Sequence, residues 1–411
     1  MMLVYNAIVY FVWFMATYYL VFFMLSLFTY RGNLFEKKKY TSKKHPLVSI
    51  IVPAFNEEES IGESIDSLKK TTYKNIEFLV INDGSTDRTS EIVREKIEDD
   101  SRFRFFDNSV NQGKATILNQ GIAESKGEMV ACMDADSIIE DNIVEKVLPY
   151  FSEKKVGAVT VSVEVNKPKG VLQKICALEF ALGLSLFLKL FSFLDCVFVT
   201  PGPFSMYRKS VLNKIGGFNP ENITEDHEIA FRIHKHGYKI RNCIEAKVFT
   251  TLPDTFKGIY VQRRRWYSGA IQTFFQHKNM LGKPKYGLFG YFIPFNFFLI
   301  GMGLMLFTAT TIMTISRNAR EIFFYRHTDF NFFEHFSINI DLLYIGQVNI
   351  LGISLFLSTI VLMIVGVKIT KRKFSDNKVG VLGYPFMFFL YQLYWGGALL
   401  AVLKRKKIKW R

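Results

Sequence analysis

Cysteine is scarce in this sequence, and the four cysteines that occur stand far apart. None forms a Cys-x-x-Cys pair or combines with histidine at a spacing that suits a metal. This pattern argues against both a zinc site and a disulfide framework, and we expect reduced thiols that are mostly buried. The four residues are Cys132, Cys176, Cys196 and Cys243.

The sequence also lacks the stripe of basic and aromatic residues that is typical of nucleic-acid-binding proteins, although its formal net charge is +15. Its basic residues gather beside apolar segments, at 37–44, 368–373 and 404–411. Because lysine and arginine favour the anionic inner face of a membrane, we expect membrane lipid as a partner and no nucleic acid.

Charged side chains are absent from residues 3–30, which are apolar almost without interruption up to Arg31. A helix of this length crosses a bilayer. A cleavable signal peptide would have a basic start and a shorter apolar run, so the segment 1–31 is predicted to be a retained transmembrane anchor. The basic residues that follow should stay in the cytoplasm, which places the next domain there.

The middle of the sequence resembles a soluble protein, although 16% of the whole chain is aromatic and the mean hydropathy is +0.14. Apolar strand-like runs alternate with helix-like segments, which predicts an α/β domain with a mostly parallel, doubly wound sheet. Ligands of such sheets bind at the carboxyl ends of the strands. We expect strands at 47–53, 76–81, 103–106, within 129–137 and at 157–165, and helices that end near Lys70 and Glu98 or begin after Gly113.

A second apolar run, residues 175–194, is interrupted by Glu179 and Lys189. If this run crossed the membrane, the residues after it would lie on the wrong side. We therefore predict an amphipathic helix that lies on the membrane surface.

Three further apolar segments follow, at roughly 286–315, 342–367 and 379–403. Three complete crossings would leave the basic tail outside the cell, against the positive-inside rule. One segment is therefore expected to be re-entrant or interfacial, so that the region 271–411 would hold two or three spanning helices and a basic tail. The last segment is the main candidate because of Gly383, Pro385, Gly396 and Gly397.

The stretch 129–137, MVACMDADS, ends an apolar run with two carboxylates, Asp134 and Asp136. As a buried strand it would deliver both acids to the ligand-binding edge of the sheet. Two acids one residue apart can share a divalent cation such as Mg²⁺ or Mn²⁺, which commonly holds a phosphate. The alternative is a solvated turn that ends the strand.

Six short motifs occur in order along the chain and are flanked by the apolar segments: VPAFNEE, NDGSTD, NQGKATILNQG, DADS, TED and QRRRW. In this order they resemble the membrane-embedded family-2 glycosyltransferases with a GT-A fold, a group that includes the synthases of cellulose, chitin, hyaluronan and poly-N-acetylglucosamine. The motifs cover about residues 45–270. The resemblance implies that this region forms a Rossmann-like GT-A domain, with the interfacial helix near 175–194.

The resemblance also implies a nucleotide pocket at the sheet edge. Asp83 would hold the base, since a carboxylate can accept the imide N–H of uracil; many relatives have another aspartate where this chain has Asn82. Asp134 would lie near the ribose and Asp136 on the metal. Further substrate-binding residues on this side would be Pro53, Ala54, Glu57 and, near the phosphates, Lys114. Plain turn and helix-start roles are the alternatives.

Inversion at the anomeric carbon needs a base on the face opposite the leaving group, to take the proton of the acceptor hydroxyl. The resemblance assigns this role to Asp226 and places Glu225 beside it among the substrate-binding residues. The alternative is a helix-capping motif that begins with Thr224. Three nearby histidines are expected to be surface or packing residues: His227, His234 and His236.

Gln262, Arg265 and Trp266 match the QxxRW motif of processive family members. Arg265 can bind a pyrophosphate bidentately, and Trp266 offers a flat face on which an acceptor sugar can stack. The alternative is a basic amphipathic helix at the membrane surface, which Arg263 and Arg264 would suit.

These expectations describe an inverting, metal-dependent glycosyltransferase of the plasma membrane, with several spans and a cytoplasmic catalytic domain. Its donor would be a nucleotide sugar, with a UDP-sugar expected, and it would extend and export a β-linked polysaccharide, alone or with accessory subunits. Only one amino-terminal span is predicted, where many such synthases have more. Two alternatives stay open: transfer of a single sugar to a membrane lipid, and a catalytically silent membrane scaffold that kept the fold.

Overall fold

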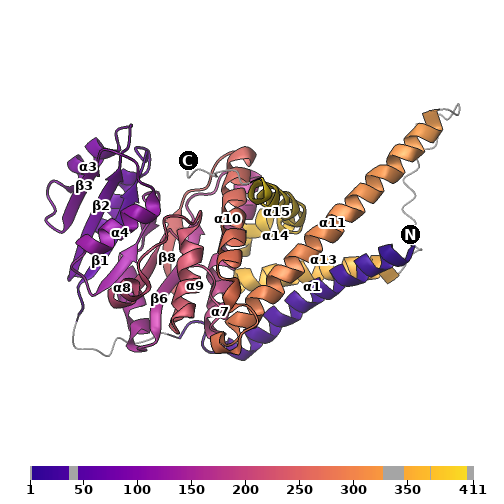
Figure 1. Ribbon diagram of the computed structural model, residues 1–411, viewed down its shortest axis with the longest axis horizontal. Coiled ribbons are helices and arrows are strands. Elements are labelled where there is room, and N and C mark those ends of the chain that lie inside the picture. Colours follow the sequence, from indigo (N-terminus) through magenta and orange to yellow (C-terminus); the bar gives the residue numbers. More distant parts are fainter. Residues whose placement is uncertain (1, 37–44, 327–346, 371, 405–411) are drawn as a thin grey trace.

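The computed structural model describes residues 2–36, 45–326, 347–370 and 372–404 (Figure 1). The basic cluster at 37–44, the tail beyond Lys404 and the start of the apolar segment expected at 342–367 lie outside the described residues. The described chain comprises an α/β domain and a group of long helices that project from it.

A single eight-stranded sheet forms the centre of the described α/β domain. Its strands are β1 (Val48–Ala54), β2 (Ile76–Asp83), β3 (Phe103–Asn108), β4 (Met129–Cys132), β5 (Ile138–Ile139), β6 (Val156–Val165), β7 (Ser205–Arg208) and β8 (Lys239–Thr250). They stand in the order β3-β2-β1-β4-β7-β6-β8-β5. The strands from β3 to β4 are all parallel, whereas β7 runs antiparallel to both of its neighbours. The predicted α/β class with a Rossmann-like half is confirmed, and beyond β4 the sheet is mixed.

Continuous apolar runs produce the parallel half of the sheet. Every residue of β1 and of β2 is buried, as is typical of parallel strands that helices cover on both faces. The helices of the domain are α2 (Ile61–Lys69), α3 (Thr89–Ile97), α4 (Lys114–Glu124), α5 (Ile143–Val147), α8 (Lys209–Ile215), α9 (Glu225–Lys235) and α10 (Phe256–Gln276), with 3₁₀ turns at Leu148–Ser152, Lys278–Met280 and Pro284–Tyr286.

The helix expected near 175–194 packs between the sheet and the long helices. It comprises α6 (Gly170–Phe180), a π-helical segment at Ala181–Phe187, and α7 (Leu188–Phe193). Its 24 residues are apolar enough to cross a membrane, yet 72% of them are buried inside the protein. Its position at a membrane surface stays a prediction.

The two faces of this helix have different partners. On the domain side, Lys189 Nζ donates to the Asn242 carbonyl oxygen at 3.0 Å, and Ser162 Oγ donates to Ser185 Oγ at 2.6 Å. On the other side, a row of leucines packs in one cluster with residues of α1 (Met2–Tyr30) and α13 (Gln347–Ile369). Because its polar groups bond to the domain, an apolar run with internal charges is stable in this position. The leucines are Leu178, Leu182, Leu186 and Leu190.

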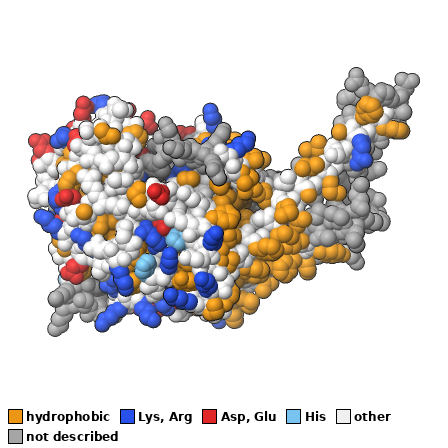
Figure 2. All heavy atoms as spheres, in the orientation of Figure 1, with side chains coloured by type: hydrophobic (Ala, Val, Ile, Leu, Met, Phe, Trp, Pro, Cys, Tyr) orange, Lys and Arg blue, Asp and Glu red, His pale blue; other side chains and the backbone are white. Residues whose placement is uncertain are grey.

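The long helices α1, α11 (Phe289–Arg326) and α13 lie side by side and extend away from the domain (Figure 1). Hydrophobic side chains cover them, whereas charged side chains gather on the domain (Figure 2). Among the described residues, the windows 13–30, 170–193 and 289–306 are long and apolar enough to span a membrane, and a bent pair near the carboxyl end would make a fourth candidate.

That bent pair is the last apolar segment of the chain. Helices α14 (Phe374–Gly383) and α15 (Met387–Leu403) are joined by the 3₁₀ turn Tyr384–Phe386, and the chain bends by 57° between Phe386 and Leu390. α14 packs against α6, and α15 packs against α10. Pro385, one of the residues for which a re-entrant segment was predicted, lies in the turn just before the bend.

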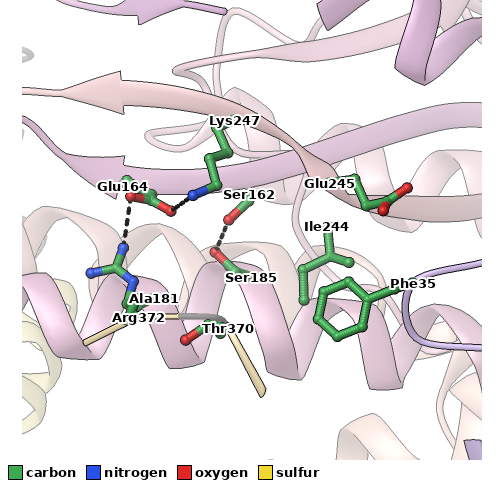
Figure 3. A pocket seen from close by; sticks show the side chains of 10 residues that line it. All are labelled: Phe35, Ser162, Glu164, Ala181, Ser185, Ile244, Glu245, Lys247, Thr370 and Arg372. Carbon is green, nitrogen blue, oxygen red and sulfur yellow. Dashed lines mark hydrogen bonds and ion pairs between the residues drawn. The ribbon is translucent and has the colours of Figure 1, made fainter. Parts of the chain in front are cut away.

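A cavity of about 160 Å³ marks the junction between the α/β domain and the end of α13 (Figure 3). Here Glu164 of β6 forms ion pairs with Lys247 of β8 and with Arg372, which follows α13, each at 2.9 Å. These pairs tie the end of a long helix to the sheet.

A buried ion pair joins three further helices. Arg263 Nη2 of α10 lies 2.6 Å from Glu179 Oε2 of α6, and the Tyr391 hydroxyl of α15 donates to the other oxygen of Glu179 at 2.9 Å. The Arg263 side chain is only 1% exposed. Because a guanidinium at this depth needs a counter-charge, Glu179 holds α6 and α10 together.

Glu179→Ala should lower the free energy of unfolding by about 3–5 kcal/mol, because it leaves the buried Arg263 guanidinium unpaired. The loss is measured as a lower Tm of the detergent-solubilised protein. Asp66→Ala is the control, since Asp66 pairs with Lys96 at the surface, where such pairs contribute about 0–1 kcal/mol. Equal losses in the two variants would contradict the role of the buried pair.

Candidate active site

The strands β1, β2 and β4 end at the same edge of the sheet, and the loops after β1 and β2 are bonded to each other there. Asn56 lies in the left-handed region at φ +53°. Its Oδ1 accepts from the Thr86 N–H at 2.9 Å, and its own N–H donates to Ser85 Oγ at 2.9 Å. The Glu57 N–H donates to Thr89 Oγ1 at 2.8 Å. Pro53 and Ala54 thus end β1 at this edge, and Glu57 belongs to a loop with a defined shape.

Asp83, at the end of β2, holds the start of α4. Its two carboxylate oxygens accept the N–H groups of Gln112 and Gly113, at 2.7 and 2.9 Å. Burial raises the pKa of Asp83, although these two bonds act in the opposite direction. Each oxygen keeps a second lone pair, so the predicted contact with a nucleotide base stays compatible with this structural role.

The neighbouring Asn82 uses its side chain entirely within the protein. Its Oδ1 accepts from the N–H and the hydroxyl of Ser85. Its Nδ2 donates to Ser90 Oγ at 2.9 Å and to Asp107 Oδ1 at 2.7 Å. An amide supplies the donor that Asp107 needs, whereas an aspartate at this position would place two carboxylates in contact.

Lys114, the first residue of α4, lies between two carboxylates. Its Nζ is 2.6 Å from Asp134 Oδ1 and 2.8 Å from Glu225 Oε1, and its side chain is 9% exposed. Burial disfavours its charge, but these two acids outweigh burial and raise the pKa of Lys114. The residue therefore joins the end of β4 to the start of α9, in addition to the predicted role near phosphates.

The space behind this ion pair admits no side chain. A Cβ at Gly202 would lie 2.6 Å from Asp134 Oδ2 and 2.8 Å from Lys114 Nζ. The Asp134 N–H donates to the Gly202 carbonyl oxygen at 3.2 Å. Glycine at this position allows the loop before β7 to lie against the two charged groups without displacing them.

Asp136 lies in a negatively charged environment. Burial, together with the carboxylates of Asp134 and Glu57, raises its pKa to about 7, although the Ser137 hydroxyl that bonds to it acts in the opposite direction. Among the described residues, no group of three or more His, Cys, Asp or Glu side chains could hold a metal ion. A site of one or two carboxylates completed by phosphate oxygens and water is nevertheless typical of Mg²⁺, and a cation here would relieve the repulsion on Asp136. The donor set therefore fits an ion that arrives with a nucleotide.

Asp226 stands in the first turn of α9. Its Oδ1 accepts the N–H of His227 at 2.9 Å and lies 3.5 Å from Nδ1 of the same residue. Burial alone would raise the pKa of Asp226, but His227, Lys114 and Arg265 outweigh it and lower this pKa. The side chain of Thr224, the capping residue, makes no capping hydrogen bond. An ionised carboxylate at this place can accept a proton.

The three histidines lie in different surroundings. His227 is half-buried beside Asp226. His234 is buried, bonds through Nε2 to the Val197 carbonyl oxygen at 2.7 Å, and has its pKa lowered to about 4 by burial. His236 is exposed. His234 and His236 therefore are packing and surface residues as expected, whereas the contact of His227 with Asp226 was not anticipated.

Helix α10 presents its QRRRW residues to the site and to the core. Arg265 lines a cavity of about 200 Å³ with the start of α4 and residues 220–223. Gln262 Oε1 is buried and has no hydrogen-bond partner among the described residues. The Arg263 guanidinium lies 4.3 Å from the centre of the Trp266 ring and occupies one of its faces. A surface position for Arg263 is therefore wrong, because this residue pairs with Glu179 in the interior.

Several known proteins are similar to this chain in sequence. The family described as glycosyl transferase family 2 matches residues 49–216. The chain is 29% identical over 275 residues to a poly-beta-1,6-N-acetyl-D-glucosamine synthase of Staphylococcus epidermidis, and 29% identical over 272 residues to a synthase of the same name from Staphylococcus aureus. Each of these matches spans 66% of this chain and 66% of the relative.

A solved structure extends the likeness of the fold to nearly the whole chain. It is a mannosyltransferase from Pyrobaculum calidifontis in complex with GDP-Man and Mn²⁺. The TM-score is 0.59, and the match covers 95% of this chain and 99% of the mannosyltransferase at 19% identity. The α/β domain and the long helices together therefore have the same overall fold as this mannosyltransferase.

Asn82→Asp should destabilise the protein by about 1–3 kcal/mol at neutral pH, because it replaces a donor to Asp107 with a second carboxylate. The bonds from Asn82, Ser90 and Arg94 outweigh burial and lower the pKa of Asp107. Their stabilisation is therefore present at neutral pH and is lost as the pH falls through that lowered pKa. The Tm difference between variant and wild type should accordingly shrink in acid.

The exchange Asn82→Asp/Asp107→Asn is the control, because it keeps one amide and one carboxylate at this contact. It should be more stable than Asn82→Asp alone. A Tm difference that is independent of pH, or no recovery in the exchange, would contradict the account of Asn82.

Proposed function

We infer what this chain does from the glycosyltransferase family 2 domain that residues 49–216 form. We propose that it transfers an N-acetylhexosamine from a nucleotide sugar, expected to be a UDP-sugar, to a growing β-linked polysaccharide with inversion at the anomeric carbon. The printed names of its Staphylococcus relatives support the N-acetylglucosamine class. The observation that carries the proposal is the meeting of Asp134, Glu225 and Lys114 at the carboxyl edge of the sheet.

The proposed roles follow from the position of each group. Asp83, the end of β1 with Pro53 and Ala54, and the following loop with Glu57 bind the nucleoside, because they lie at the edge at which β1 and β2 end. Lys114 and Arg265 carry the positive charge nearest to the diphosphate. Gln262 and Trp266 lie on the same helix as Arg265 and border the path of the acceptor.

Asp226 acts as the base. It takes the proton of the acceptor hydroxyl as that oxygen forms a bond with the anomeric carbon, and the bond from this carbon to the nucleoside diphosphate breaks. The leaving group takes the electron pair of the broken bond, and the proton stays on Asp226. The lowered pKa of Asp226 means that the carboxylate is ionised at neutral pH, the state in which it can accept this proton.

Asp136, with Asp134 next to it, would hold a divalent cation, Mg²⁺ or Mn²⁺. Such an ion neutralises negative charge on the departing diphosphate. The surroundings of Asp136 support this assignment, because burial and the carboxylates of Asp134 and Glu57 together raise its pKa to about 7 and a cation would offset both effects. The Mn²⁺ in the mannosyltransferase of similar fold gives further support.

The proposal includes a place in the cell. Residues 1–31 would be a transmembrane anchor, 45–270 a cytoplasmic GT-A domain, and 271–411 a membrane region, all in the plasma membrane with several spans. The candidate spans and the hydrophobic surface of the long helices support it (Figure 2). In this arrangement the product leaves across the membrane as it grows.

Transfer of one sugar to a membrane lipid is the second candidate. One observation favours it: Arg263 already occupies one face of the Trp266 ring, the ring on which an acceptor sugar would stack. A lipid acceptor would approach along the apolar helices instead.

Product size over time, with purified protein in lipid vesicles, a panel of UDP-sugars and Mn²⁺ or Mg²⁺, tests the proposal. We expect a polymer that lengthens with time from UDP-N-acetylhexosamine alone. A product that stays one sugar long and partitions with lipid would replace polymer synthesis by the lipid candidate. Absence of any transfer from every donor would overturn both.

Asp136→Asn should lower turnover by at least about 100-fold, equivalent to ~2.7 kcal/mol. It should also weaken nucleotide binding when Mn²⁺ is present but not when it is absent, because only the cation needs this carboxylate. Calorimetric titration with UDP, with and without Mn²⁺, measures the difference. Asp141→Asn, at an exposed aspartate, is the control. Equal weakening with and without the metal would exclude Asp136 as a metal ligand.

A further inference from the structure

The short loop 219–224 that leads into α9 is seated on helix α10. This loop also forms one wall of the cavity that contains Lys114 and Arg265. Two residues after the loop comes Asp226. The position of the loop therefore determines where the carboxylate of Asp226 stands.

Helix α10 has a glycine, Gly269, at the place where the loop touches it. A Cβ at Gly269 would lie 2.1 Å from Oγ1 and 2.4 Å from Cγ2 of Thr224. Thr224 is 1% exposed, so it has no room to move aside. Any residue larger than glycine at 269 must push the loop away from the helix.

Amide side chains complete the attachment. Gln272 Oε1 accepts the Ile223 N–H at 3.1 Å, and Gln272 Nε2 donates to the Glu221 carbonyl oxygen at 3.0 Å. Asn222, which is buried, donates to Thr273 Oγ1 at 3.1 Å and accepts the Thr224 N–H at 3.0 Å. The loop is thus held on α10 by hydrogen bonds to its backbone as well as by the close contact between Thr224 and Gly269.

The same face of α10 carries Arg265. Gly269 follows Arg265 by four residues and Gln272 follows it by seven, a spacing that places all three along one side of a helix. The contacts of the loop are therefore made one and two turns beyond the guanidinium that lowers the pKa of Asp226.

We propose that Gly269 and Gln272 are positioning residues: they seat the loop 219–224 on α10 and so fix the distance between Asp226 and Arg265. The inference rests on the proposed function, because it presupposes that Asp226 is the base. Neither residue touches a reacting atom. Their effect is on the alignment of the base with the bound donor.

Gly269→Ala should lower kcat by about 10- to 100-fold, because a displacement of the base by about 1 Å has effects of this size. The Kd for UDP should change by less than about 3-fold, since the loops after β1 and β2 do not touch Gly269. Gly396→Ala is the control: Gly396 lies in a helix, and a Cβ there meets nothing within 4 Å. The control should keep the wild-type kcat.

The double variant Thr224→Gly/Gly269→Ala tests whether the contact with Thr224 causes the loss of kcat in Gly269→Ala. It removes the Thr224 side chain that the new methyl group would strike, and glycine caps helices about as well as threonine. If the contact is responsible, the double variant should have a higher kcat than Gly269→Ala. A kcat in the double variant no higher than in Gly269→Ala would overturn the proposal, as would an unchanged kcat in Gly269→Ala.

Gln272→Glu is a second variant in case the alanine variant fails to fold. It keeps the acceptor for Ile223 and replaces the donor to Glu221 by an oxygen, so kcat should again fall while UDP binding holds. A fall in UDP affinity that matches the fall in kcat would overturn the positioning role. If the wild-type protein itself transfers no sugar, the proposed function fails, and that outcome is separate from these comparisons.

Discussion

The charge of Lys114 holds the two halves of the site together. Its ammonium group lies within 2.8 Å of carboxylates from the end of β4 and from the start of α9. Two carboxylates at such short range would repel each other strongly without a cation between them, since a pair of unit charges about 4 Å apart interacts by ~4 kcal/mol at an effective dielectric constant of 20. The proposed nucleotide side of the site and the proposed base are therefore kept together by the two ion pairs of one buried lysine, and Gly202 leaves the space that they require.

Helix α10 connects this site to the helices that project from the domain. On one face it carries Arg265 and the seat of the loop before Asp226; elsewhere on the helix Arg263 forms the buried pair with Glu179, which Tyr391 of α15 joins. A helix held at several points moves as a rigid body, because its packed neighbours have few alternative arrangements. A shift of α6 or α15 would therefore reach the site through α10. This link is physical and contiguous, and it needs no conformational change within α10 itself.

Much of the fold could be predicted from the sequence because the central parallel strands β1, β2 and β4 are largely apolar and buried. The run before Asp134 and Asp136 was interpreted as a buried strand, and sheet geometry then placed the two acids at the ligand-binding edge. The partners of Lys114 and Arg263 could not be predicted, since Glu225 and Glu179 are far away in the sequence. For Arg263, the local pattern of three arginines favoured a solvated face, and only tertiary packing reveals its buried carboxylate.

The contacts of Asn82 and Gly269 were hidden for a different reason. Asn82 differs from the aspartate of many relatives, and the sequence alone suggests a change in base recognition. In the structure the Asn82 amide donates a hydrogen bond to Asp107 on the next strand. The asparagine at position 82 is therefore explained by a neighbour within the sheet. Gly269 stands inside a helix, where glycine is unfavourable by about 1 kcal/mol relative to alanine. Such a cost indicates a close approach, but the approaching residue, Thr224, is known only from the fold.

The balance of charge at the sheet edge indicates what the site requires from its ligand. Lys114 is committed to Asp134 and Glu225, so its charge is already shared when a diphosphate arrives. Arg265 stands opposite Asp226 and lowers that pKa, while Asp136 faces Asp134 and Glu57 with its pKa raised to about 7. An incoming diphosphate would add negative charge to an edge that already has an excess of it. A divalent cation would offset this excess of negative charge, which is why the proposed metal and the proposed donor belong to one proposal.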